Sequence, residues 1–254
     1  MAETSPIGEA GAGAEGAGAR VFATTHWSVV AAAGSEPSPE SNAALTELCR
    51  AYWYPLYAYV RRKGYEVADA QDLTQEFFAR LLEAKSLATV DRRRGKFRSF
   101  LLGALENFLA KEWTRAHRLK RGGGMTILSW DAQDPEARYQ IEPADDWTAE
   151  RVYERRWALT VLEQAMAAVR LEYNTSESRA TLFEALRSFI SGDDMDVSYP
   201  ELSKQLGMNE GATRVAVHRL RQRYGEAVRA EVAKIVQRPE DVDDEIRHLF
   251  ASLS

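Results

Sequence analysis

Cysteine is almost missing from this chain of 254 residues, since Cys49 is the only one. A disulfide framework within the chain and a zinc site built from several thiolates are therefore excluded, and a reducing cytoplasm is the expected compartment. No run approaches the ~20 apolar residues of a membrane span, and residues 1–20 lack the apolar segment of a signal peptide. We expect a soluble cytoplasmic protein without a membrane partner.

Signatures of catalysis are missing as well. The sequence contains no HExxH, GxSxG or phosphate-binding-loop pattern. Asp69, Asp72 and Glu76 are spaced to share one helix face, but no histidine lies near them in the sequence. Such a face is more often solvated or bound to a partner than used for metal binding or acid–base chemistry. We therefore predict a protein that is not an enzyme and needs neither a metal nor a cofactor.

Strand-like alternation of apolar and polar residues is the third absence, and it predicts an all-α fold. Apolar residues instead recur three or four positions apart, as on one face of a helix. Leu73, Phe77 and Leu81 are an example of this spacing. The expected helical segments are residues 45–64, 67–84, 95–121, 147–171 and 177–190, followed by a pair of helices over 198–224.

Composition divides the chain into two small helical domains. We predict the first over residues 21–121 and the second over residues 151–236. Residues 122–150 begin with glycines and are rich in Asp, Glu and Pro, so they are expected to form an acidic linker. Residues 1–20 are mostly small and should be a disordered tail. Residues 237–254 would then be an acidic C-terminal extension.

The stretch SYPELSKQLGMNEGATRVAVHRLRQRY, residues 198–224, predicts two helices around a tight turn. Ser198 and Glu201 fit a capping box, and Gly207 can take the left-handed conformation that ends a helix. Asn209 can cap the second helix. That helix has a buried stripe, formed by Thr213, Val217, Leu220 and Tyr224. A short helix, a glycine turn and a longer basic helix predict a C-terminal helix-turn-helix.

Basic and polar side chains lie off that stripe, where a DNA-binding helix meets the major groove. The expected base contacts are Glu210, Arg214 and His218, and the expected phosphate contacts are Arg219, Arg221 and Arg223. The alternative is a surface helix with solvated arginines. A second basic segment favours DNA binding, because residues 91–121 contain ten basic residues against three acidic ones. Trp113 lies within this segment and suits stacking on unpaired bases. Most of the other aromatic residues of the segment are expected in the core.

Three motifs in this order resemble known promoter-recognition proteins. DAQDLTQEFFARLL and GKFRSFLLGALENFLAKEW, followed much later by the helix-turn-helix, resemble regions 2 and 4 of the extracytoplasmic-function (ECF) sigma factors of bacterial RNA polymerase. The resemblance covers about residues 45–121 and 157–230. It implies a transcription initiation factor whose partners are core RNA polymerase and promoter DNA, and it leaves room for an anti-sigma factor.

The resemblance also implies roles for individual residues. The polymerase would dock on Asp72, Gln75 and Glu76. The −10 element would be contacted, as it melts, by Arg98, Phe100, Asn107, Lys111, Trp113, Arg115 and Arg118. The −35 element would be read by Asn209, Glu210, Arg214, His218, Arg219 and Arg221. The linker is expected to run through the polymerase cleft.

Two departures from the family pattern indicate a divergent subgroup. Residues 169–197 make the segment before the helix-turn-helix longer than usual, and Lys111 stands where the family usually has aspartate.

An alternative function is a one-component transcription regulator with a separate sensing domain, which would explain the helix-turn-helix but not the second basic segment. The acidic residues of 131–150 also have two interpretations: they mask the basic surfaces in the free protein, or they are a solvated linker.

Overall fold

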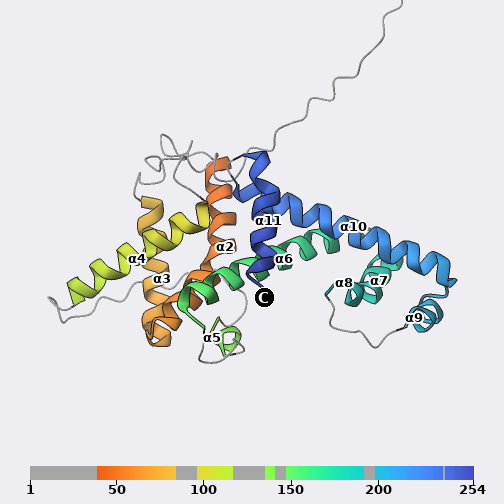
Figure 1. The fold of residues 1–254 in the computed structure, drawn as a ribbon, viewed down its shortest axis with the longest axis horizontal. Helices are drawn as coiled ribbons and strands as arrows, with labels where there is room; N and C mark the ends of the chain where they lie inside the picture. Colours follow the sequence, from red (N-terminus) through yellow and green to blue (C-terminus); the bar gives the residue numbers. More distant parts are fainter. Residues whose placement is uncertain (1–38, 84–95, 117–134, 141–146, 192–197, 237) are drawn as a thin grey trace, which may run out of the picture.

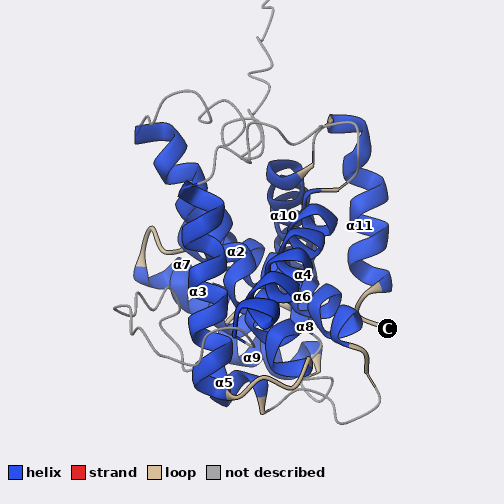
Figure 2. Cartoon of the chain, turned by 90° about the vertical axis from the view of Figure 1, so that its left-hand side faces the viewer, coloured by secondary structure: helices blue, strands red, loops and turns tan. Residues whose placement is uncertain are grey.

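The computed structural model describes residues 39–83, 96–116, 135–140, 147–191, 198–236 and 238–254. Every regular element in these ranges is helical (Figures 1 and 2). The all-α class predicted from the sequence is therefore confirmed. The helices are α2 (Pro39–Arg62), α3 (Val67–Glu83), α4 (Phe97–Ala116), α5 (Pro135–Tyr139), α6 (Ala149–Tyr173), α7 (Glu177–Leu186), α8 (Ser188–Ser191), α9 (Tyr199–Leu206), α10 (Glu210–Ile235), the short 3-10 helix η2 (Pro239–Asp241) and α11 (Val242–Ala251).

A large buried cluster, called here the first core, lies among α2, α3, α4, α6, the C-terminal part of α10 and α11. Tyr59 of α2, Phe77 of α3 and Leu105 of α4 contribute to it, as their spacing predicts. Trp157 of α6, Val232 of α10 and Leu249 of α11 also belong to it, and all three are almost fully buried. The first core therefore draws helices from well beyond the first expected domain.

A smaller cluster, the second core, surrounds the C-terminal helices. Val169 near the end of α6 packs with Phe183 of α7, Leu202 of α9, and Val217 and Leu220 of α10. The long helices α6 and α10 lie side by side and each contributes to both cores (Figure 1). Each of these two continuous helices therefore reaches from one core to the other.

Three predicted segments between or outside the domains have different outcomes. The expected tail, residues 1–20, lies outside the described residues. The described part of the expected linker includes α5, whose Glu136 forms an ion pair of 2.9 Å with Arg61 at the end of α2. The expected C-terminal extension contains α11, which is packed into the first core by Val242 and Leu249. Its apolar face explains why it docks and does not project as an acidic appendage.

Candidate nucleic-acid interface

The turn between α9 and α10 has the capping geometry that the sequence predicts. The Ser198 backbone N–H donates to Glu201 Oε2 at 2.9 Å, and the Glu201 N–H donates to Ser198 Oγ at 3.4 Å. Gly207 has a φ of 63°, and the Met208 N–H reaches the Ser203 carbonyl at 3.0 Å, which is a Schellman ending. Asn209 Oδ1 then accepts the N–H of Ala212 at 2.8 Å and starts α10. The predicted capping box, left-handed glycine and N-cap are confirmed.

The two helices are joined by a buried hydrogen bond as well as by apolar packing. Ser203 Oγ of α9 donates to Thr213 Oγ1 of α10 at 3.0 Å. Thr213, Val217 and Leu220 are buried and Tyr224 is half-buried, so the predicted stripe is the inner face of α10. This packing determines which side chains of α10 face outward.

Gly207→Ala is expected to lower the free energy of unfolding by about 1 to 2 kcal/mol, because a Cβ is strained in the left-handed region. No neighbouring atom lies within 4 Å of that Cβ, so the cost is conformational. Gly225→Ala, inside α10 with equally open surroundings, is the matched control and should raise the free energy by about 0.5 to 1 kcal/mol. Urea unfolding measures both changes, and effects of the same sign would contradict this turn geometry.

The outward face of α10 carries the predicted DNA contacts, with one difference. Arg214, His218 and Arg219 are exposed. Arg214 lies over the Tyr199 ring at 4.7 Å and 3.9 Å from Glu210, contacts that a DNA base can replace at the exposed end of the side chain. Arg221 instead donates two hydrogen bonds, of 3.2 and 3.0 Å, to the Phe189 carbonyl of α8. Its guanidinium is thus directed toward α8.

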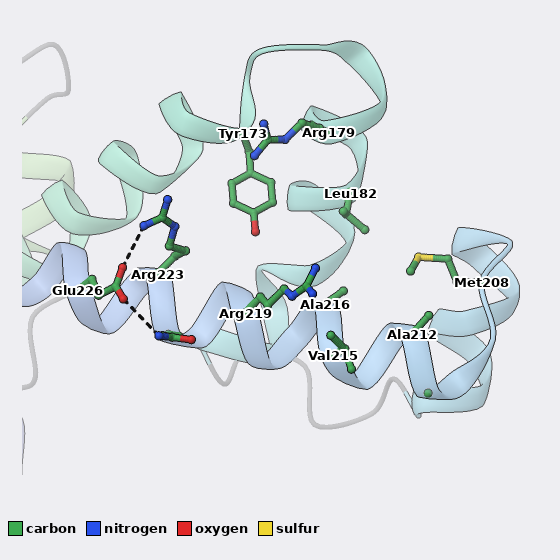
Figure 3. Close-up of a pocket in the computed structure, with 12 residues that line it drawn as sticks. Tyr173, Arg179, Leu182, Met208, Ala212, Val215, Ala216, Arg219, Arg223 and Glu226 are labelled. Atoms are coloured by element: carbon green, nitrogen blue, oxygen red, sulfur yellow. Dashed lines mark hydrogen bonds and ion pairs between the residues drawn. The ribbon is translucent and has the colours of Figure 1, made fainter.

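A cavity of about 740 Å³ adjoins this face and has no counterpart in the sequence predictions (Figure 3). It lies between α7 and α10. Apolar side chains of Leu182, Met208 and Val215 line it, and arginines Arg179 and Arg219 border it. Val215 is 49% exposed, and an apolar residue on the outer face of a basic helix is the signal that could have indicated this groove.

The second basic segment includes α4, and its described residues are only partly exposed. Asn107, Lys111 and Trp113 are exposed toward its C-terminal end, as expected of a DNA-contacting face. Arg118 lies outside the described residues, and the side chain of Arg115 is likewise not described. Phe100 is half-buried against the first core. Among the described cations of this segment, Lys96 and Lys111 are exposed and Arg98 is buried.

Arg98 differs most from its expected position. Its side chain is only 5% exposed, with Nε 2.7 Å from Glu245 Oε1 of α11 and a second ion pair to Glu154 of α6. The guanidinium also lies 5.0 Å from the centre of the Trp157 ring. Two carboxylates from distant parts of the chain neutralise this charge, so Arg98 is an internal residue in this structure and not an exposed DNA contact.

The outer face of α3 carries the expected polymerase-docking residues. Asp72 is exposed, whereas Gln75 and Glu76 are half-buried, and all three lie off the side that buries Phe77 and Leu81. Glu76 pairs with Arg80 at 2.5 Å, and the same arginine pairs with Glu112 of α4 at 2.7 Å. This face is therefore polar and accessible, and the ion pair between Arg80 and Glu112 holds it against α4.

Within the described ranges, no group of three or more His, Cys, Asp or Glu side chains is arranged to hold a metal ion. No helix there is long and apolar enough to cross a membrane.

Comparison with protein families identifies one segment of the chain. Residues 48–119 match the model of sigma-70 region 2, a span that runs from α2 past the end of α4. No curated protein and no solved structure matched the chain. The match covers less than a third of the sequence and supports a sigma-70 family factor with a role in transcription initiation. Core RNA polymerase and promoter DNA are the partners that such a domain implies.

Proposed function

We propose that the chain is a transcription initiation factor of the ECF type. It binds core RNA polymerase through the outer face of α3, contacts the −10 element through the exposed part of α4, and reads the −35 element with α10. It acts in the cytoplasm beside the polymerase, which keeps all of the nucleotide chemistry. An anti-sigma factor that controls its access to the polymerase is compatible with this role.

The observation that carries this proposal is the region 2 match over residues 48–119. The matched helices include the α3 face with Asp72 and the exposed Lys111 and Trp113 of α4. A capped pair of helices with outward arginines follows later in the chain, in the order that a sigma factor requires. The match also occupies the part of the chain where a one-component regulator would have its sensing domain, which argues against that alternative.

Run-off transcription with core polymerase and fragments of the source genome tests the proposal. We expect the purified chain to direct initiation from a limited group of fragments and to copurify with the core enzyme. A chain that binds specific duplexes but neither copurifies with the polymerase nor starts transcription would instead be a one-component regulator.

Arg214→Ala and Arg219→Ala should affect DNA binding differently. Arg214 is placed near the start of α10 for a base edge, so its loss should cost about 1 to 3 kcal/mol of discrimination at one upstream base pair. Arg219 is placed for a phosphate, so its loss should weaken binding to all sequences and make the salt dependence shallower by about 0.9 in log–log slope. Binding to matched and mismatched duplexes across a salt series measures both. Indistinguishable variants would refute this division of roles.

A further inference from the structure

We infer that α11 is an autoinhibitory latch that covers the basic start of α4 in the free protein. The inference rests on the proposed function, in which α4 faces promoter DNA. It assigns a regulatory role to a C-terminal helix that lies outside the matched region 2 segment.

Glu245 is the centre of the contact. Its side chain is only 4% exposed, and its two carboxylate oxygens lie 2.7 Å from Arg98 Nε and 2.5 Å from Lys96 Nζ. Both cations belong to the basic segment that the sequence predicts as a DNA-binding surface. Docking of α11 therefore pairs two positive charges at the N-terminal end of α4: Arg98 is buried, whereas the Lys96 side chain remains 42% exposed.

The net negative charge of the α11 region also repels DNA. Residues 238–251 contain five acidic residues against two arginines. Like charges repel phosphates over roughly a Debye length, about 8 Å at physiological ionic strength. While α11 is docked, DNA that approaches this end of α4 meets an acidic helix.

The contact is built so that it can open. Helix α11 has 10 residues. An isolated helix of that length is only marginally stable in water, so α11 depends on its packing against the rest of the protein. Val242 and Leu249 are its buried apolar side chains, and His248 Nε2 lies 3.0 Å from Glu154 Oε2. The attraction within a buried ion pair is largely offset by the desolvation of both ions. A partner that competes for Arg98 and Lys96, as a phosphate chain does, can therefore shift the balance toward release.

Glu245→Gln tests the latch, with Asp244→Asn as the matched control. Both substitutions remove one negative charge from α11, but the Asp244 side chain is 65% exposed and pairs only with Arg247 of the same helix among the described contacts. Hydrogen exchange of the α11 amides reports release. Fluorescence anisotropy with a labelled single-stranded oligonucleotide of mixed sequence reports DNA binding by the polymerase-free protein.

We expect Glu245→Gln to speed exchange in α11 while α4 stays protected, and to bind the oligonucleotide severalfold more tightly at low salt. The log–log salt slope should steepen by up to about 1.4, since each of two exposed cations adds about 0.7 on a single strand. Asp244→Asn should change neither exchange nor slope. His248→Ala, which removes a contact of α11 with Glu154 but leaves Glu245 paired with Arg98 and Lys96, should act in the same direction more weakly.

Three results would overturn the inference. The first is an α11 that stays protected in Glu245→Gln, and the second is release of α11 without tighter binding. The third is loss of protection throughout the first core in both Glu245→Gln and His248→Ala, which would make α11 an ordinary part of that core. Promoter-directed transcription by the parent chain separates these outcomes from failure of the proposed function, because it does not depend on the latch.

Discussion

Trp157→Ala is expected to lower the free energy of unfolding by about 3 to 5 kcal/mol, the range for removing a large buried aromatic side chain. Trp157 is 1% exposed and lies in α6, yet it packs in the first core. Its ring lies 5.0 Å from the Arg98 guanidinium and has its centre 6.1 Å from that of the His248 ring. A cavity there would loosen the start of α4, α6 and α11 at once.

Trp113→Ala is the matched control, because Trp113 is 59% exposed on α4 and should cost about 1 kcal/mol or less. Urea unfolding followed by circular dichroism measures both variants. If α6 belonged only to a separate C-terminal unit, Trp157→Ala would leave α2, α3 and α4 as stable as in the parent. That result would contradict the shared core.

The elements that the sequence predicts well are those whose signals are local. The capping box at Ser198, the left-handed Gly207 and the stripe through Val217 each depend on residues within a few positions. Helical spacing likewise identifies Phe77 and Leu105 as inward-facing. In each case the backbone geometry follows from short-range hydrogen bonds and one apolar face, so no knowledge of distant contacts is needed.

The burial of Arg98 could not be predicted in this way. Its partner Glu245 lies 147 positions away, and nothing near Arg98 in the sequence indicates a carboxylate at that distance. A partial signal exists in α11 itself, where Val242, Ile246 and Leu249 recur at helical spacing and predict an amphipathic helix. Composition hides this signal, because the acidic residues around it suggest a solvated extension.

The contacts of the acidic linker likewise join residues that are distant in the sequence. Glu136 pairs with Arg61 at the C-terminal end of α2, and Glu150 pairs with Lys63, the residue that follows this helix. The hydrogen bonds from Arg61 hold the pKa of Glu136 below its usual value, so this contact stabilises the fold at neutral pH and weakens as the carboxylate is protonated. These two acids therefore engage α2, and not the outward faces of α4 or α10. The other acids of 131–146 lie outside the described residues.

The double substitution Gln75→Ala and Glu76→Gln is expected to weaken binding to core RNA polymerase by about 2 to 4 kcal/mol, the loss typical of hot-spot residues. That corresponds to a roughly 30- to 800-fold higher dissociation constant. Both residues lie on the outer face of α3, away from buried Phe77 and Leu81, so the fold should be retained. Thermal melting checks the fold, and a titration of labelled protein with core enzyme measures the affinity.

Glu112→Gln tests whether Glu76 contacts the polymerase directly or only holds Arg80 in place. Glu76 and Glu112 both pair with Arg80, whose guanidinium lies 5.0 Å from the centre of the Phe108 ring, so either substitution removes one of its two partners. If Glu76 only holds Arg80 in place, Glu112→Gln should weaken polymerase binding as much as Glu76→Gln does. If Glu76 contacts the polymerase, only its own substitution should do so, because Glu112 is 16% exposed and turned toward α3. Equal losses would remove Glu76 from the docking surface and leave Asp72 and Gln75 as its remaining members.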